Sequence, residues 1–244
     1  MGMPVTLKNQ KVLVVGASSG IGREIARLMA GEGAQVVAAA RRLDRLKTLR
    51  DDSAAAGNPI DVAEADASRF EDMQELGRQA ISKLGGLDIL VYAAGTNTPD
   101  RALTRLNAEI WNTLLEVNLN GAYYITDAVL RPMREAKAGH LIYISSISGL
   151  VPDVSGAAYQ ASKRGLVGLA HAIRVEEKEN GIRTSVVCPG LVDTELIEKR
   201  PVKPSAETLS KALKPIDVAE LVLAIAKMPA HVVIPEVQIL PTTL

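Results

Sequence analysis

The sequence predicts an α/β fold in which a parallel sheet carries helices on both of its faces. Short apolar runs rich in Val, Ile, Leu and Ala alternate with helical patterns along nearly the whole chain, which is typical of β-α-β units. The runs have no polar face, as expected of strands buried between two helical layers. With 244 residues, 47% of them hydrophobic, residues 1–244 suit a single domain with a large aliphatic core.

The predicted strands are short apolar runs, and the predicted helices show apolar residues at three- and four-residue spacing. We expect strands at residues 11–15, 35–39, 61–65, 87–93, 140–145, 183–188 and 231–240. We expect helices at residues 20–31, 41–56, 68–84, 109–136, 156–179 and 216–228. Ser68 is a suitable N-cap for the third helix. The proline-containing stretch 198–215 is expected to form a mobile surface loop with a short helix.

Composition and charge exclude several classes of protein. The 28 basic and 28 acidic side chains give a formal net charge of zero, which argues against nucleic-acid binding through bulk charge. No apolar stretch reaches the length of a signal-peptide core or a membrane span, so we expect no membrane association. Cys188 is the only cysteine, which suits a reducing, cytoplasmic compartment and a buried core position. The three histidines lack metal-ligand spacing, and no metal is predicted.

A glycine-rich segment follows the first predicted strand and opens the first helix. It reads Gly16-Ala17-Ser18-Ser19-Gly20-Ile21-Gly22. Glycines at such a turn let a pyrophosphate approach backbone N–H groups, and the N-terminus of the helix adds a positive dipole. The segment therefore indicates a dinucleotide site, and an ordinary glycine-rich turn without a ligand is the alternative.

Tyr159 and Lys163 lie four residues apart in the helix predicted at residues 156–179, so they share one helical face. A phenol has an ordinary pKa near ~10, and an ammonium within ~4–6 Å favours the phenolate and lowers that pKa. The pair is therefore predicted to act as an acid and base toward an alcohol or carbonyl oxygen. An amphipathic helix that happens to carry a Tyr and a Lys at its edge is the alternative.

Four further segments complete an ordered set of motifs. They are Tyr92-Ala93-Ala94-Gly95, Asn118 in the helix at 109–136, Ser145-Ser146 after the fifth strand and Pro189-Gly190 after the sixth. Together with the glycine-rich segment and the Tyr159–Lys163 pair, they resemble the compact short-chain dehydrogenase/reductase family over about residues 11–194. The resemblance implies a Rossmann fold with a seven-stranded parallel sheet, and an oxidoreductase that interconverts an alcohol and a carbonyl with a nicotinamide cofactor.

Two positions depart from the family pattern. Val15 stands where the family has Thr, and Tyr92-Ala93 replaces two Asn residues. The hydrogen bonds that those side chains make in relatives must be lost or replaced here. We expect an effect on stability and no loss of chemistry.

The resemblance assigns a catalytic role to Asn118, Ser146, Tyr159 and Lys163. Tyr159 would pass a proton to or from the substrate oxygen, and Lys163 would lower the pKa of that phenol and hold the nicotinamide ribose. Ser146 would donate a hydrogen bond to the same oxygen, and it is preferred to Ser145 because it stands thirteen residues before Tyr159, the spacing of the family. Asn118 would anchor a water-linked proton path, and a polar position on a solvated helix face is its alternative.

The residues that the resemblance places around the cofactor come from every motif, with Asp66 after the third strand as an adenine contact whose alternative role is helix capping. They are Gly16, Ser18, Ser19, Gly20, Ile21, Gly22, Arg41, Arg42, Asp66, Ala93, Ala94, Gly95, Asn118, Tyr159, Lys163, Pro189, Gly190, Val192 and Thr194.

The end of the second strand predicts which cofactor binds. Enzymes that prefer NAD usually place an acid there, on the ribose 2′-hydroxyl, whereas this chain has Ala40 followed by Arg41 and Arg42. A guanidinium can make bidentate bonds to a 2′-phosphate, so NADP(H) is predicted, with Arg41 as the main ligand and Ser18 adding a hydroxyl. The alternative is that both arginines only begin the solvated face of the second helix.

The sequence therefore predicts an NADP(H)-dependent oxidoreductase that acts on a small carbonyl or alcohol, with a homodimer or homotetramer as the family suggests. The chain end at residues 228–243 resembles relatives that act on 3-hydroxy acids and serine-like substrates, and a 3-oxoacyl thioester reductase is the alternative. A catalytically idle dinucleotide-binding regulator and a lyase or epimerase of the extended branch are less favoured. Segments 96–103, 148–156 and 191–213 are expected to form the substrate pocket.

Overall fold

The computed structural model describes residues 6–243, and its centre is a seven-stranded sheet in the order β3-β2-β1-β4-β5-β6-β7. Every neighbouring pair of strands is parallel, which confirms the predicted fold class. The strands are β1 (Lys11–Val15), β2 (Gln35–Ala40), β3 (Ile60–Glu64), β4 (Ile89–Tyr92), β5 (Gly139–Ile144), β6 (Ile182–Pro189) and β7 (Glu236–Ile239). The first six lie within a few residues of the predicted runs, and the last is shorter because only four residues pair with β6.

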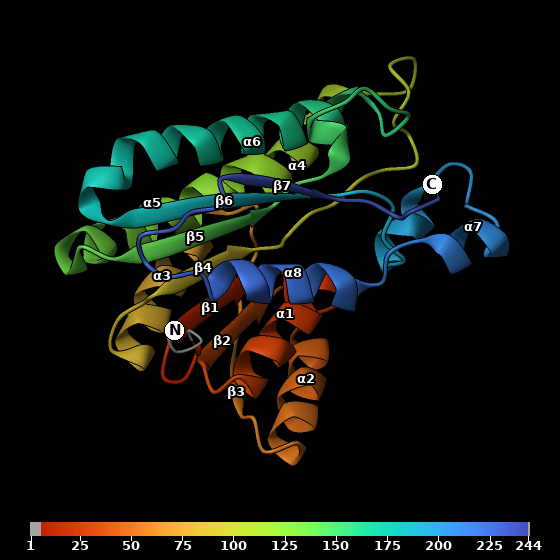
Figure 1. Cartoon of the computed structure of the whole chain (residues 1–244). Coiled ribbons are helices and arrows are strands. Elements are labelled where there is room, and N and C mark those ends of the chain that lie inside the picture. Colours follow the sequence, from red (N-terminus) through yellow and green to blue (C-terminus); the bar gives the residue numbers. More distant parts are fainter. Residues whose placement is uncertain (1–5, 244) are drawn as a thin grey trace.

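Helices cover both faces of the sheet (Figure 1). One face packs against α1 (Gly20–Gly31), α2 (Leu43–Ala55) and α8 (Pro215–Ala226), whose apolar residues share one core cluster with alternate residues of the strands. The other face packs against α3 (Phe70–Leu84), α5 (Gly121–Ala136) and α6 (Ala157–Glu177) in a second cluster. Because strand side chains alternate between faces, both clusters need apolar residues at every strand position.

The chain adds β2 and β3 on one side of β1 and then returns to add β4 on the other side of β1. Loops after these two strands diverge to opposite faces, and ligands of such sheets bind in the resulting crevice. Gly16 follows β1 with a φ of +92°, and a Cβ there would lie 2.4 Å from the backbone nitrogen of Ala94. Only glycine permits this close approach, so the sequence brings the two loops together at the crevice.

The helical region predicted at 109–136 is present, and it contains a π-helical segment that was not expected. It consists of α4 (Ala108–Leu115), the π-helical segment η1 (Glu116–Asn120) and α5. A π-helical turn widens the helix and weakens its regular backbone bonding. The hydroxyl of Tyr92 donates a hydrogen bond to the carbonyl of Val117 inside this segment. A tertiary contact therefore holds a turn that periodicity does not reveal.

Ser68 is not the N-cap of the third helix. That helix begins at Phe70 with Arg69 at its cap position and no side-chain capping bond. Ser68 instead donates from its backbone N–H and its hydroxyl to Asp66, at 2.9 and 2.8 Å. The serine is used to close a turn after β3 rather than to start the helix.

The remaining segments are short. The stretch expected to be a loop contains α7 (Ala206–Lys211), and a 3-10 segment η4 (Glu195–Lys199) precedes it. Two other 3-10 turns lie at Ile147–Gly149 and Lys178–Asn180. Within residues 6–243, none of the helices combines the length and the apolar character that a membrane crossing requires.

Candidate active site

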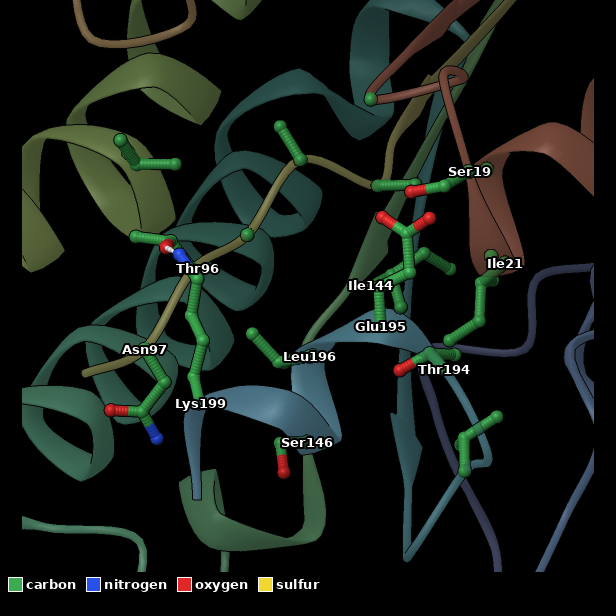
Figure 2. A pocket seen from close by; sticks show the side chains of 18 of the residues that line it. Ser19, Ile21, Thr96, Asn97, Ile144, Ser146, Thr194, Glu195, Leu196 and Lys199 are labelled. Carbon is green, nitrogen blue, oxygen red and sulfur yellow. Dashed lines mark hydrogen bonds between the residues drawn. The ribbon is translucent and has the colours of Figure 1, made fainter. Parts of the chain in front are cut away.

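A cavity of about 460 Å³ opens at the carboxyl ends of the central strands. Figure 2 shows side chains from the glycine-rich loop, from the loop after β4 and from η4 facing into it. Of all the residues predicted for the cofactor and for catalysis, every one except Asn118 lines this cavity. Motifs that are far apart in the sequence therefore meet in one cavity, at the crevice where ligands of such sheets bind.

The glycine-rich loop fits a pyrophosphate. A Cβ on Gly22 would lie 2.4 Å from the carbonyl oxygen of Gly16, and Gly20 has a φ of +56°. Ser19 stands at the N-cap of α1, yet its side chain makes no capping hydrogen bond. The first-turn N–H groups of α1 are therefore not occupied by that side chain, and with the helix dipole they form a suitable anion cradle.

The two arginines after β2 have different surroundings. Arg41 is largely exposed, and its Nη1 lies 3.8 Å from Oδ2 of Asp66. Arg42 donates from Nη2 to the hydroxyls of Ser18 and Ser19, at 2.9 and 2.7 Å. Arg42, rather than Arg41, therefore lies beside the glycine-rich loop.

Tyr159 and Lys163 both face the cavity from α6. The Nζ atom of Lys163 lies 5.9 Å from the centre of the Tyr159 ring, and it donates to the carbonyl of Ile144 at 3.0 Å. Lys163 is 4% exposed, and burial lowers the pKa of its ammonium to about 8. The lysine is therefore held against the end of β5 with its ammonium near the Tyr159 ring.

The expected lowering of the pKa of Tyr159 is wrong for the cofactor-free protein. Burial raises the pKa of Tyr159, because an apolar surrounding disfavours the phenolate. Contact with the Ser146 hydroxyl and the charges of Arg101 and Arg200 act in the opposite direction, whereas Asp153 adds to the rise. The phenol therefore keeps its proton at neutral pH.

The two adjacent serines, Ser145 and Ser146, make different contacts. Ser145 donates from its hydroxyl to the backbone carbonyl of Lys163 at 2.9 Å, which fixes α6 against β5. Ser146 faces Tyr159 closely enough to influence its pKa, and it accepts a hydrogen bond from the backbone N–H of Ser148 at 3.2 Å. The hydroxyl beside the phenol is that of Ser146, in agreement with the choice made from spacing.

Asn118 is fully buried behind the cavity wall. Its Oδ1 accepts from the backbone N–H of Thr96 at 2.7 Å, and its Nδ2 donates to the Thr96 carbonyl and to Ser162 Oγ, both at 3.0 Å. A solvated helix face is therefore the wrong reading of this residue. Its side chain holds the loop after β4 against α6, and it makes no direct contact with the Lys163 ammonium in the described hydrogen bonds.

Comparison with known proteins decides the family. A family model for short chain dehydrogenase matches residues 10–204. The chain belongs to the short-chain dehydrogenase family.

Similar proteins include curated and structurally known members. An uncharacterised oxidoreductase of Staphylococcus aureus is 34% identical over 238 residues, covering 97% of this chain and 100% of that protein. The closed form of a serine dehydrogenase complexed with NADP+ is 32% identical, with a TM-score of 0.85 over 93% of each chain. A variant of the actinorhodin polyketide ketoreductase with NADPH is 30% identical, with a TM-score of 0.88 over 99% of this chain and 98% of that one.

In this short-chain dehydrogenase, other contacts replace part of the hydrogen bonding that is lost where the sequence departs from the family pattern. Tyr92 is fully buried, and its hydroxyl reaches the Val117 carbonyl next to Asn118. Ala93 lies against Gly22, where a Cβ would meet the Ala93 side chain at 3.2 Å. Val15 is a buried member of the core without a hydroxyl. A new hydrogen bond from Tyr92 therefore supports the loop that carries the site.

Sequence reasoning missed three cations at the substrate end of this short-chain dehydrogenase. Arg101, Lys199 and Arg200 line the same cavity as Tyr159. Arg101 donates from Nη2 to the carbonyl of Lys199 at 2.7 Å, and Lys199 donates from Nζ to Thr96 Oγ1 at 2.6 Å. They lie in segments already expected to form the pocket, but no spacing signal connects residue 101 to residues 199 and 200.

A serine–aspartate network lines another part of the cavity. Asp153 accepts hydrogen bonds from Ser148 Oγ at 2.5 Å and from the N–H and hydroxyl of Ser155 at 2.8 and 3.0 Å. Asn97 donates from Nδ2 to the Ser155 carbonyl at 3.2 Å. The carboxylate of Asp153 is thus committed to shaping the loop beside Tyr159 and Ser146.

Proposed function

We propose that this short-chain dehydrogenase uses NADP(H) to interconvert an alcohol and a carbonyl on a small substrate that carries a carboxylate. A 3-hydroxy acid or a serine-like amino acid has this chemistry. Support for NADP(H) comes from Arg42 and Ser18 beside the glycine-rich loop, with no acid at Ala40. It also comes from the serine dehydrogenase and the polyketide ketoreductase, which bind NADP+ and NADPH.

The observation that carries the substrate class is the set of cations around Tyr159. Neighbouring cations in the same segments are paired, Arg105 with Asp100 and Lys203 with Glu198. By contrast, none of the ion pairs among residues 6–243 involves Arg101, Lys199 or Arg200, and Asp153 attracts Arg101 only from beyond ion-pair distance. Burial lowers the pKa of Lys199, and Arg41 and Arg42 add to that effect. A substrate carboxylate would relieve this unbalanced positive charge.

The chain's own groups divide the work as follows. Arg101 and Arg200 would hold the carboxylate and so orient the substrate oxygen toward Tyr159 and Ser146. Tyr159 would give its proton to a carbonyl oxygen during reduction, while the Ser146 hydroxyl donates a hydrogen bond to the developing negative charge. Lys163 would hold the ribose of the cofactor. The bound nicotinamide supplies or accepts the hydride.

The test compares acids with their neutral counterparts. Arg101→Met should raise KM for a 3-hydroxy acid by about 10- to 100-fold, since a hydrogen bond to a charged group contributes ~1.5–3 kcal/mol. The methyl ester of the same acid should be turned over equally well by both proteins. Arg105→Met is the matched control, because Arg105 pairs with Asp100 outside the cavity. Equal losses for acid and ester would contradict a carboxylate site.

A 3-oxoacyl thioester reductase is the second candidate. It is favoured by the similarity to the polyketide ketoreductase and by exposed apolar side chains in the three pocket segments. Leu103, Val154 and Val202 are 74%, 87% and 83% exposed. A panel of hydroxy acids, amino acids and acyl thioesters, followed by NADPH absorbance, separates the two. Strong activity on thioesters with none on the acids would replace the first proposal by the second.

A further inference from the structure

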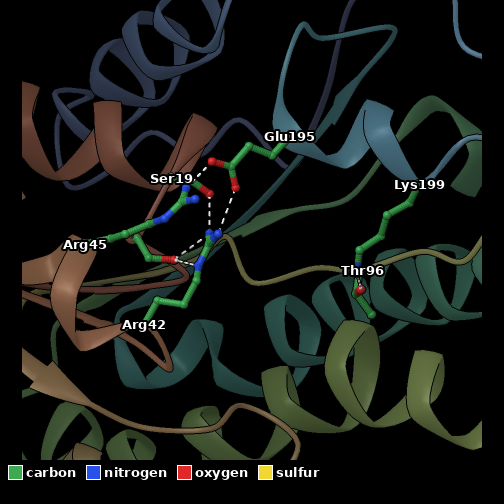
Figure 3. A network of polar contacts seen from close by, with 7 residues as sticks. Ser19, Arg42, Arg45, Thr96, Glu195 and Lys199 are labelled. Atoms are coloured by element: carbon green, nitrogen blue, oxygen red, sulfur yellow. Dashed lines mark hydrogen bonds and ion pairs between the residues drawn. The ribbon is translucent and has the colours of Figure 1, made fainter.

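Glu195 links the substrate loop to the loop that would hold the cofactor's 2′-phosphate. It is the first residue of η4, directly after Thr194. Its Oε2 accepts from Arg42 Nη1 at 2.8 Å, and its Oε1 accepts from Arg45 Nη1. Figure 3 shows the carboxylate beside Arg42 and Arg45, and Ser19 joins the same polar network through Arg42. Residues 150 or more positions apart in the chain thus meet at a single anion.

A carboxylate offers the same kind of acceptor as a phosphate. Arg42 uses Nη1 for Glu195 while its Nη2 and Nε donate to Ser18 Oγ, at 2.9 and 3.2 Å. The hydrogen bonds to Arg42 and Arg45 lower the pKa of Glu195 to about 2. The group is therefore charged at any physiological pH. The guanidinium of Arg42 already has an anion beside it, and the protein itself supplies it.

We propose that Glu195 is an internal competitor for the cofactor's 2′-phosphate and thereby a specificity-determining residue. The phosphate takes over Arg42 from Glu195 and frees the first turn of η4. A cofactor without the phosphate leaves the Glu195–Arg42 pair intact. The inference rests on the use of NADP(H) proposed above.

Release of Glu195 from Arg42 also affects the part of the cavity where the substrate would bind. The segment η4 carries Lys199 at its other end, and Arg200 follows it. Lys199 donates to Thr96 Oγ1 beside Asn118, so η4 bridges the cofactor loop and the loop after β4 (Figure 3). Occupation of Arg42 by a phosphate is thereby coupled to the position of two cations that face the substrate.

Calorimetric titration of the whole protein with 2′,5′-ADP and with 5′-AMP tests the competition. These two ligands differ only by the 2′-phosphate, and NADP and NAD form a second such pair. Glu195→Gln should bind 2′,5′-ADP and NADP about 3- to 10-fold more tightly than wild type, as expected for removal of a half-exposed ion-pair network. Affinity for 5′-AMP and NAD should stay within about twofold. Glu198→Gln, which removes a carboxylate of the same segment that pairs with Lys203, should match wild type.

Limited trypsin digestion gives a second readout that needs no catalysis. Arg200 and Lys203 both precede proline, so cleavage in this stretch is expected after Lys199. For wild type, 2′,5′-ADP should speed this cleavage and 5′-AMP should not. Glu195→Gln should be cleaved at the fast rate without any ligand.

Three results would overturn the inference. They are unchanged or weaker binding of 2′,5′-ADP by Glu195→Gln, equal tightening for 5′-AMP, and protection of Lys199 by 2′,5′-ADP in wild type. A wild-type protein that prefers NADP but shows one of these results refutes the role of Glu195 alone. A wild-type protein that binds NAD more tightly than NADP refutes the proposed cofactor as well, so the two failures are distinguishable.

Discussion

Replacing Tyr92 by Phe removes one buried hydroxyl at the point where this chain departs from its family. The Tyr92 side chain is fully buried, and burial strongly raises the pKa of its phenol. Its hydroxyl donates to the Val117 carbonyl in the π-helical segment η1. Phe would keep the ring in place and leave that carbonyl without its side-chain donor.

The structure sets the size of the effect. A buried acceptor that loses its partner costs ~1–3 kcal/mol, and no water-sized gap is created because only one oxygen is removed. For a chain of this length, ~1 kcal/mol shifts the melting temperature by about 2–4 °C. We therefore expect Tyr92→Phe to lower the melting temperature by about 3–10 °C. Because Asn118 keeps its bonds to Thr96, turnover well below the transition should change by less than about threefold.

Tyr143→Phe is the matched control for thermal unfolding followed by circular dichroism. Tyr143 pairs with Tyr92 in the sheet and is also fully buried. Its hydroxyl meets Thr126 Oγ1, which can still donate to the Ala122 carbonyl after the substitution. No acceptor is left unpaired, so the control should lose less stability. Equal melting temperatures for the two variants would refute the reasoning about the Val117 carbonyl.

Three other predictions concern chemistry, cofactor choice and assembly. Tyr159→Phe should lower turnover by ~100- to 10,000-fold with an unchanged dissociation constant for NADP, and a variant that keeps most of its turnover would exclude Tyr159 as the acid. Arg42→Ala should weaken NADP binding by about 10- to 100-fold and Arg41→Ala by less, while Ala40→Asp should shift the preference toward NAD. Fluorescence titration measures the affinity of all three variants, and a larger loss of NADP affinity for Arg41→Ala would make Arg41 the main ligand of the 2′-phosphate. Light scattering should show a dimer or tetramer at micromolar concentration, because Tyr123 and Val175 on α5 and α6 are exposed apolar side chains, and a monomer would contradict this.

The sequence predicted the fold well because strand and helix signals here arise from burial. Continuous apolar runs mark strands covered on both faces, and β1 with its neighbours has that burial. What it could not predict depends on particular side-chain contacts. The π-helical turn accepts a hydrogen bond from the Tyr92 hydroxyl, 25 residues away. The Ser68 hydroxyl bonds to Asp66 two residues earlier, a local turn that competes with helix capping. Neither leaves a periodic signal in the chain.

The sequence predicted the backbone of the candidate site better than it predicted the directions of the charged side chains. Glycine positions report close backbone approach, and Gly16 and Gly22 lie where a Cβ would clash. The direction of a long side chain is set by its partners instead. Arg41 turns to Asp66 and Arg42 to Ser18, and the local sequence pattern does not predict either direction. The meeting of Arg42 with Glu195 joins segments that local pattern cannot relate.

The spacing of Tyr159 and Lys163 predicted a lowered phenol pKa, and burial produces the opposite direction. Both groups lose solvent, so the charged form of each is disfavoured: the pKa of Tyr159 rises and that of Lys163 falls to about 8. The phenol therefore keeps its proton, which is the form that carbonyl reduction consumes. Alcohol oxidation needs the phenolate, and additional positive charge in the cavity would favour it. An oxidised nicotinamide carries such a charge, so the ionisation that the sequence suggests is a property expected of the loaded site rather than of the Tyr159–Lys163 pair alone.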